Sequence, residues 1–363
     1  MAISLDAQIQ GMHQQADERR YLHRNSVPKG ASIFLDSKSD GRIRPLVDLR
    51  CSNDSTKANH TQIPEQNTIL NAVASGRFRS KIDPSDAYFQ TRVHPENIKY
   101  NTIKTHFGSF TRQVMMQGEM NASSTFVSTM EGLLHDELGE HICAYIPDIF
   151  VFTDTCEGHV KGVTNACSKL QHAGYHPNPR KCLFFATKLD IVGHMIDDDG
   201  IHPAPGQIRT IMDCTSPLSQ KELHGFNGTV NYISWFIPHI GTIRAPLTDL
   251  SGKTQWLWTD LQEAACEAVK RAADKHKVLR PIVYDTPDMM WPFTNASPTG
   301  TGASIAQRPT SDAALPAACH SRKLTPSQSN NPTHQQETRA IIEAMEAFAS
   351  HLLHTQFIVV TDH

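Results

Sequence analysis

The sequence lacks long apolar runs, a secretory leader pattern and paired cysteines. No window approaches about 18 consecutive apolar residues, the length that crosses a bilayer. Residues 1–20 have no cationic start followed by an apolar stretch. These absences favour a soluble, intracellular protein without a membrane partner. The eight cysteines include no C-x-x-C pair, and Cys143, Cys167 and Cys266 lie in apolar runs. Neither a disulfide framework nor a zinc site is expected.

The chain also lacks an excess of either charge. Lys and Arg total 34 and Asp and Glu total 37, so any basic surface that could meet a nucleic acid must be local. Hydrophobic residues make up 39% of the chain and charged residues 20%, which is ordinary for globular proteins and argues against wholesale disorder. A chain of 363 residues can bury the cores of two or three domains.

Turn signals and apolar periodicity predict short strands and helices in the first part of the chain. Residues 1–30 are polar, and Asp17–Arg24 can form a short exposed helix. Two strand-like runs within 31–49 flank Asp40-Gly41, which is a hairpin signal. The next predicted elements are a helix over Asn67–Ser75 ended by Gly76, a basic strand over 77–83, and a hairpin from Tyr100 to Met116 around Gly108.

The following segment has the order helix, β-hairpin, helix. Asn121 can cap a helix that Gly139 can end, because apolar residues recur between them at helical spacing. The stretch "AYIPDIFVF" (144–152) consists of two apolar runs around a tight turn, with Pro147 and Asp148 at its tip. A second amphipathic helix is marked by Val160, Val163, Cys167 and Leu170. This order predicts an α+β fold in which two helices cover one face of a sheet.

After Gly200 the pattern becomes helical and then returns to strands. Ser219 and Glu222 form a capping-box pattern ahead of a helix, and Asp260–Glu263 offers a similar start for the next one. The predicted buried face of the first helix carries Leu223, Phe226, Val230 and Ile233. Strands return from about Ile282, followed by a helix around 337–353 and the strand "FIVVTDH".

Three aspartates lie where strands end or turn. Asp83 follows the strand that contains "RSKI", Asp86 comes three residues later, and Asp148 lies at the hairpin tip. Each alone is more often a turn or cap residue than a ligand. An aspartate at the end of one strand and another at the turn of a neighbouring hairpin can nevertheless converge on one sheet edge. Two such carboxylates can hold Mg²⁺, which prefers oxygen ligands.

Five motifs occur together with the order and spacing of a known family. They are "SKIDPSDAYFQ" (80–90), "MMQGEMNASSTF" (115–126), "YIPDIFVF" (145–152), "NPRKCLFF" (178–185) and "LDIVGHMIDDDGI" (189–201). In these motifs the chain resembles the reverse transcriptases of gypsy-type LTR retrotransposons. The later stretches "ELHGFNGTVNYISWFIPH", "FTNASPTGTGASIAQ" and "QQETRAIIEA" are similar to the thumb and the RNase H domain of the same Pol polyprotein. The resemblance extends from about residue 31 to the last residue.

The resemblance implies an α+β right-hand polymerase followed by an α/β RNase H-like domain. The expected divisions are a polar segment over 1–30, fingers and palm over 31–204, a helical thumb or connection over 205–281, and an RNase H-like remainder over 282–363. This last domain is expected to be incomplete at its C-terminus. The implied partners are an RNA or DNA template-primer and deoxynucleoside triphosphates, and the implied cofactor is a pair of Mg²⁺ ions. Cytoplasmic and nuclear locations both fit, and the oligomeric state stays open.

The resemblance also implies roles for individual residues. Asp83 and Asp148 match metal-binding, catalytic aspartates, and Lys181 matches a lysine that can donate a proton to the pyrophosphate. Tyr88 is placed as the steric gate against a 2′-hydroxyl. The remaining residues that match nucleotide-binding positions are Lys38, Arg44, Asp86, Ala87, Gln117 and Gly118. From residue type alone, Lys38 and Arg44 are equally well explained as solvated hairpin residues.

Two departures from the family pattern fall on metal ligands. The family hairpin reads Tyr-x-Asp-Asp, and Pro147 replaces the first of the two acids. The RNase H motif begins Thr-Asp-Ala-Ser, and Asn295 replaces its aspartate; Glu337 and Asp362 match the next two acidic ligands. Both departures predict weakened metal binding.

Three hypotheses follow: a working RNA-directed DNA polymerase with RNase H activity, a degenerate and catalytically impaired relative (a pseudoenzyme), or a non-catalytic nucleic-acid-binding or co-opted interaction protein with the same fold. The loss of two metal ligands favours the second hypothesis over the first. No single residue of the sequence directly indicates a co-opted interaction role. The sequence cannot decide whether any polymerase or RNase H activity remains.

Overall fold

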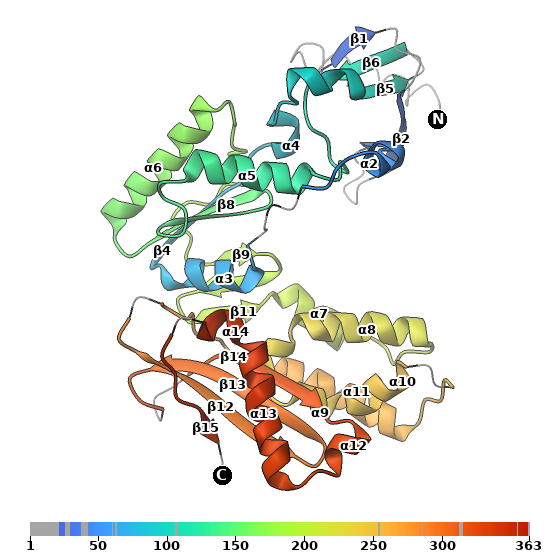
Figure 1. Ribbon diagram of the computed structural model, residues 1–363, viewed down its shortest axis with the longest axis vertical. Helices are drawn as coiled ribbons and strands as arrows, with labels where there is room; N and C mark the ends of the chain where they lie inside the picture. The colour runs from blue at the N-terminus through green and yellow to red at the C-terminus, as the bar shows by residue number, and fades with distance from the viewer. Residues whose placement is uncertain are drawn as a thin grey trace. The chain divides into compact units, whose positions relative to one another are not determined.

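The structure of the protein is a computed structural model that describes residues 22–25, 30–37, 43–59, 61, 64–105, 108–252, 255–284, 286–311, 315–353 and 355–361. The chain forms two compact units (Figure 1). Unit 1 comprises residues 1–64, 80–151 and 157–184, and unit 2 comprises residues 65–79, 152–156 and 185–363. The α+β fold class predicted from the sequence is confirmed.

A five-stranded sheet forms one part of unit 1. Its order is β1-β6-β5-β2-β3, with β1 at Leu22–Asn25, β2 at Ala31–Ser37, β3 at Ile43–Val47, β5 at Thr102–Thr105 and β6 at Gly108–Arg112. The predicted helix over Asp17–Arg24 is wrong for Leu22–Arg24, because these residues pair antiparallel with β6 and their backbone groups bond across the ladder. The first residues of that prediction lie outside the described part of the chain.

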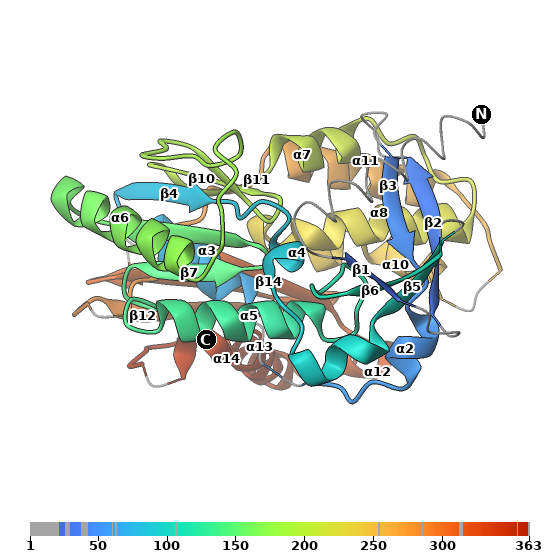
Figure 2. The same cartoon turned by 90° about the horizontal axis from the view of Figure 1, so that it is seen from above.

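A second, three-stranded sheet in the order β4-β8-β7 carries two helices on one face. Its strands are β4 (Phe78–Ile82), β7 (Ile142–Tyr145) and β8 (Asp148–Thr153), and its helices are α5 (Ala122–Leu134) and α6 (Cys156–His172). One buried cluster joins Phe126 and Met130 of α5 and Leu170 of α6 to Ile82 and Ile149 of the strands. Figure 2 shows both helices from above. Because strand residues alternate between faces, the helices bury only every second side chain of β4 and β8.

The ends and faces of these two helices differ in detail from the prediction. Asn121 precedes α5 as expected, but its side chain makes no cap bond; it accepts from the backbone N–H of Asn59 and donates to the carbonyl of Lys57. The helix ends at Leu134 and does not reach Gly139. In α6, Val160 is exposed, and the buried positions are His159, Ala166 and Leu170. Val163 and Cys167 are half-buried and pack against the same core, so the predicted face is correct except at Val160.

Three short elements complete the described part of unit 1. They are α2 (Arg50–Asp54), α4 (Ala87–Gln90) and the 3₁₀ helix η1 (Pro95–Tyr100). Asp86 precedes α4 with a φ of 46°, a left-handed conformation that aspartate tolerates better than most residues. The chain therefore turns sharply immediately after Asp83.

Unit 2 begins with a helix, a small sheet and a run of helices. The first helix is α3 (Gln66–Ser75), which ends before Gly76 as predicted. The small sheet has the order β11-β10-β9, with β9 at Leu189–Ile191, β10 at His194–Asp197 and β11 at Gly200–Pro203. The helices are α7 (Pro205–Met212), α8 (Gln220–Tyr232), η2 (Ser234–Phe236), α9 (Ile240–Ile243), α10 (Ala245–Leu250) and α11 (Asp260–Asp274).

Two of these helices begin with side-chain caps. The hydroxyl of Ser219 accepts from the backbone N–H of Glu222, as the capping pattern predicts, and Leu223, Phe226 and Val230 are buried. The capping box of α11 consists of Thr259 and Gln262, one residue earlier than the predicted Asp260–Glu263 start.

A four-stranded sheet ends the chain. Its order is β14-β13-β12-β15, with β12 at Met289–Ser297, β13 at Gly300–Arg308, β14 at Pro316–Lys323 and β15 at Val360–Thr361. β12 and β15 pair in parallel, whereas β12, β13 and β14 are antiparallel neighbours. Figure 1 shows α13 (Thr333–Ala347) lying across this sheet, next to α12 (Pro326–Ser329) and α14 (Ala349–Leu352). Ile305, Ala344 and Phe348 are among the buried residues that join the helices to the sheet.

Within the described ranges, none of the helices has the length and apolar character needed to cross a bilayer.

Candidate functional site

Asp83 and Asp148 lie on adjacent strands of the three-stranded sheet. Asp83 is the first residue after β4, and Asp148 is the first residue of β8, directly paired with Tyr145 across a two-residue turn. Ile82 and Ile149 face the helices, so the alternation of side chains places Asp83 and Asp148 on the opposite face. The structure therefore brings these two predicted site residues together on the face that α5 and α6 leave uncovered.

Each carboxylate is paired with a lysine. The Nζ atom of Lys81 lies 2.6 Å from Oδ2 of Asp148, and the Nζ atom of Lys181 lies 3.4 Å from Oδ2 of Asp83. Lys81 is mostly buried, with 20% of its side chain exposed, whereas 64% of the Lys181 side chain is exposed. The Lys81 ammonium also lies 5.9 Å from the ring centroid of Phe150, within cation–π range.

Burial raises the pKa of Asp148 above the usual aspartate value, although the hydrogen bond and charge of Lys81 act in the opposite direction. The neighbouring carboxylate of Asp83 adds to the increase. The Oδ1 atom of Asp148 is buried and has no hydrogen-bond partner among the described residues. A raised carboxyl pKa beside a second carboxylate is a feature that functional sites and structural ion-pair networks share, so the roles of these residues are argued from the geometry.

Sequence reasoning missed Lys81. The signal was present, because Lys81 and Asp83 are two residues apart on a strand and must therefore point to the same face. What the sequence could not provide was the neighbour, since Asp148 is 67 positions away from Lys81 (148 − 81). Lys181, which was predicted as a site residue, is present at the site but contacts Asp83 from its exposed side.

The predicted nucleotide-binding residues differ in their neighbours and in their accessibility. Tyr88 packs its ring edge-on against Phe126 at 6.0 Å, and its hydroxyl lies 3.5 Å from Oγ of Ser123. Ala87 is buried in the core, so only its backbone can contact a nucleotide. Gly118 has a φ of 95° and accepts a hydrogen bond from Asn53.

The structure describes the remaining predicted nucleotide-binding residues only in part. Gln117 lies in the turn ahead of α5, next to Gly118. Arg44 is described only as backbone in β3, and Lys38 lies outside the described residues. The predicted roles of Lys38 and Arg44 therefore stay predictions.

The second predicted acidic site belongs to the four-stranded sheet. Glu337 of α13 is buried; its Oε1 accepts from the backbone N–H of Ala296 at 3.2 Å, and its Oε2 accepts from the hydroxyl of Thr361 at 3.5 Å. Asn295 is exposed near the end of β12. Asp362 lies outside the described residues. Glu337 thus holds together the ends of β12 and β15, where an RNase H-like acidic site is expected.

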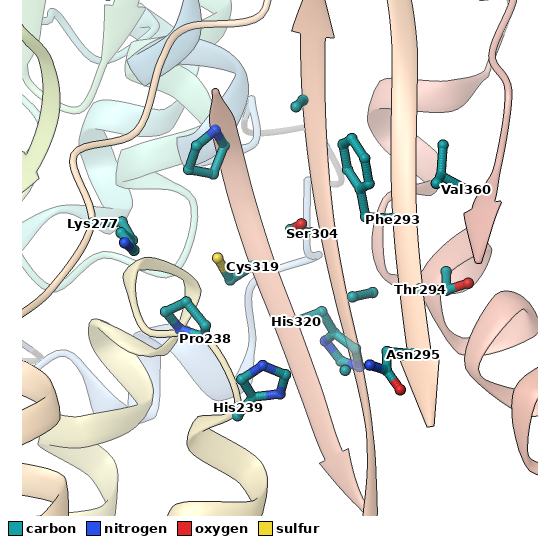
Figure 3. A pocket seen from close by; sticks show the side chains of 14 residues that line it. Pro238, His239, Lys277, Phe293, Thr294, Asn295, Ser304, Cys319, His320 and Val360 are labelled. Atoms are coloured by element: carbon teal, nitrogen blue, oxygen red, sulfur yellow. The ribbon is translucent and has the colours of Figure 1, made fainter. Parts of the chain in front are cut away.

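Asn295 also lines a cavity of about 450 Å³ in unit 2. Figure 3 shows Asn295 of β12 together with His239, Lys277 and Cys319. Gly302 pairs with Asn295 across the strands, and a Cβ atom at Gly302 would lie only 3.0 Å from Nδ1 of His239, so the glycine permits the imidazole to approach the sheet. The 14 lining residues include no aspartate or glutamate.

Neither set of residues fits a two-ion centre. The carboxylate oxygens of Asp83 and Asp148 are the donor type that Mg²⁺ prefers, and the unpartnered Oδ1 of Asp148 suits a cation. Pro147, however, supplies no third carboxylate. Among the residues that the structure describes, no group of three His, Cys, Asp or Glu side chains is arranged to hold a metal ion.

Comparison with known proteins agrees with this architecture. Residues 36–196 match the family model described as reverse transcriptase (RNA-dependent DNA polymerase), and residues 258–359 match the RNase H-like domain found in reverse transcriptase. The chain is 28% identical over 334 residues to the Transposon Tf2-3 and Tf2-7 polyproteins of Schizosaccharomyces pombe. These alignments cover 91% of this chain and 25% of each polyprotein, so the chain spans about a quarter of the length of these relatives.

Solved structures show the same fold. A foamy viral protease-reverse transcriptase in complex with double-stranded DNA is similar with a TM-score of 0.89 and 20% identity, over 98% of this chain and 74% of that chain. The same viral protein in complex with an RNA/DNA hybrid gives a TM-score of 0.83 and 20% identity, over 99% of this chain and 48% of that chain. Residues 36–196 therefore resemble a reverse transcriptase domain, residues 258–359 resemble an RNase H-like domain, and most of the chain is similar to part of a transposon polyprotein.

Proposed function

We propose that the chain is a retrotransposon-derived reverse transcriptase of the gypsy type whose polymerase and RNase H-like sites are both catalytically impaired. The observation that carries this proposal is the composition of the sheet edge: Asp83 and Asp148 are together, and Pro147 stands where the family has another acid. The proposed partners are an RNA or DNA template-primer and deoxynucleoside triphosphates.

The chemistry of the site explains why one missing carboxylate matters. Mg²⁺ ions bound by a complete set of acids would activate the primer 3′-hydroxyl and neutralise charge on the leaving pyrophosphate. The residues of this chain can still orient the reactants: Tyr88 is the proposed gate against a 2′-hydroxyl, and the exposed Lys181 can reach a phosphate. Positioning without the full charge stabilisation leaves a weak polymerase at best.

A primer-extension assay on an RNA template, with Mg²⁺ and separately with Mn²⁺, tests the polymerase proposal. We expect extension by the wild-type chain near background and a rise of roughly 10²-fold or more in Pro147→Asp, because one electrostatic contact to a transition state is worth about that factor. Pro147→Ala is the matched control, since it removes the proline without adding an acid. Robust wild-type extension that disappears in Asp83→Ala would show that the site is not impaired.

A non-catalytic nucleic-acid-binding role is the alternative. It is favoured by the similarity of nearly the whole chain to viral proteins solved in complex with double-stranded DNA and with an RNA/DNA hybrid. Binding of a primer-template duplex, measured at two salt concentrations, tests it. A surface that contacts phosphates must lose affinity as the salt concentration rises. An affinity that does not change with salt would count against this role.

A further inference from the structure

One member of the aspartate pair, Asp148, is bonded to a mostly buried cation. The ammonium of Lys81 lies 2.6 Å from Oδ2 of Asp148, and both side chains are largely buried, with 20% and 18% of their surfaces exposed. An ammonium at this distance from a carboxylate forms a charge-assisted hydrogen bond. The other lysine, Lys181, lies 3.4 Å from Asp83 and is mostly exposed, so it is the more easily displaced of the two.

The position of Lys81 is fixed from several directions. Its backbone N–H donates to the carbonyl of Leu183, and its backbone carbonyl accepts from the N–H of Leu183. Its side chain extends over the ring of Phe150. Because Lys81, Asp83, Asp148 and Phe150 alternate with residues that face α5 and α6, all four lie on the face of the sheet opposite these helices. The ammonium therefore lies at Asp148 on a mostly buried side chain and is not a freely rotating surface group.

We propose that Lys81 is the resident cation of this site and takes the place of a divalent ion in neutralising the carboxylate pair. Two carboxylates and two ammonium groups sum to zero charge, so the pair keeps its arrangement in the absence of a metal. A divalent ion can bind only by displacing the Lys81 ammonium from Asp148, which weakens metal binding beyond the loss already caused by Pro147. Lys81 is thus a positioning residue that sets metal affinity.

This inference rests on the proposed function only for the identity of the site, and it can be tested without polymerase activity. The test measures Mn²⁺ affinity by electron paramagnetic resonance and thermal unfolding in EDTA or in excess Mg²⁺, on the full chain. We expect wild-type unfolding to be unaffected by Mg²⁺. In Lys81→Met, which keeps the stem over Phe150 and removes the charge, Mn²⁺ should bind about tenfold more tightly, because the metal no longer competes with an ammonium for Asp148. Mg²⁺ should then also raise the unfolding temperature.

Three variants assign the effect to the site. Lys81→Arg keeps a cation and should behave like the wild type, and Lys161→Met removes an exposed lysine of α6 and should change nothing. The double variant Lys81→Met/Asp83→Asn should lose the tighter binding, because it removes the second carboxylate. Polymerase inactivity in all of these variants would bear on the proposed function and not on Lys81.

Two results would overturn the proposal. One is a folded Lys81→Met whose Mn²⁺ affinity equals that of the wild type. The other requires only the wild-type chain: an unfolding temperature that rises by several degrees on addition of Mg²⁺ would show that a metal, and not Lys81, is the preferred cation. This second measurement remains decisive if Lys81→Met does not fold.

Discussion

Lys81 and Asp148 come from neighbouring strands and form the closest ion pair at the aspartate site, with 2.6 Å between Nζ and Oδ2. The ion pair does not fully offset the cost of burying the Asp148 carboxylate, because the pKa of Asp148 stays above its usual value. Together with the acid missing at Pro147, it distinguishes this sheet edge from one prepared for two divalent ions.

Phe126 anchors α5 to the three-stranded sheet. It is 1% exposed and makes edge contacts with Tyr88 at 6.0 Å and Tyr175 at 6.2 Å. Phe126→Ala should lower the free energy of unfolding by about 3–5 kcal/mol, because the cavity adds to the lost transfer free energy. Chemical denaturation measures this change. Val160→Ala, at an exposed position of α6, should change it by less than about 0.5 kcal/mol; equal effects would contradict the assigned core.

Gly200 cannot carry a side chain without strain. Its φ is +136°, and a Cβ atom there would collide with the backbone oxygen of Leu279. Gly200→Ala should therefore destabilise the chain by roughly 1–3 kcal/mol. Gly225 of α8 has open space around it, so Gly225→Ala should stabilise by about 0.5–1 kcal/mol. Thermal unfolding of both variants compares the two, and a stabilising Gly200→Ala would refute the conformation described for that turn.

Glu343 of α13 is a buried acceptor. Its carboxylate accepts from Nε of Arg339 at 3.1 Å and from the hydroxyl of Thr301. Glu343→Ala should lower the free energy of unfolding by about 1–3 kcal/mol, because the buried Thr301 hydroxyl loses its charged partner. Glu346→Ala on the same helix is exposed and serves as the control. If both variants unfold at the same denaturant concentration, Glu343 makes no such contribution.

His194 should make stability depend on pH. Burial lowers its pKa below the ordinary value of 6.5, and its ring stacks on Tyr232 at 4.9 Å. The unfolded chain therefore takes up this proton first, so stability is fully present above about pH 6.5 and falls by up to about 1.4 kcal/mol per pH unit until the folded pKa is reached. Denaturant unfolding at several pH values measures the slope.

A matched pair of variants isolates the contribution of His194. His194→Phe should flatten the dependence below pH 6.5, whereas His224→Phe at an exposed position of α8 should leave it as in the wild type. The buried His159 and His351 and the half-buried His320 also have lowered pKa values, so part of the slope should remain. An unchanged slope in His194→Phe would contradict this assignment.

The sequence predicted elements whose signals are local and missed contacts that depend on distant residues. Gly76 ends α3, and Ser219 caps α8, because each signal lies within a few residues of the helix end. Val160 carried a helical apolar pattern and is exposed, since packing against the sheet and not periodicity alone selects the buried face. Likewise the motif order pointed to Asp83 and Asp148, but only the adjacency of β4 and β8 revealed Lys81 beside them.

The two-residue connection between β7 and β8 leaves little freedom for change. Tyr145 is paired directly with Asp148, so the length of that connection fixes which side of the strand receives the carboxylate. One added residue that shifted the strand by a single position would turn the acid inward among the aliphatic side chains beneath α5 and α6 and move Ile149 to the opposite face of the sheet. A substitution at Pro147 keeps the length of the connection, whereas an insertion changes it, so replacement is the route by which this hairpin can lose or regain an acid without a change of register.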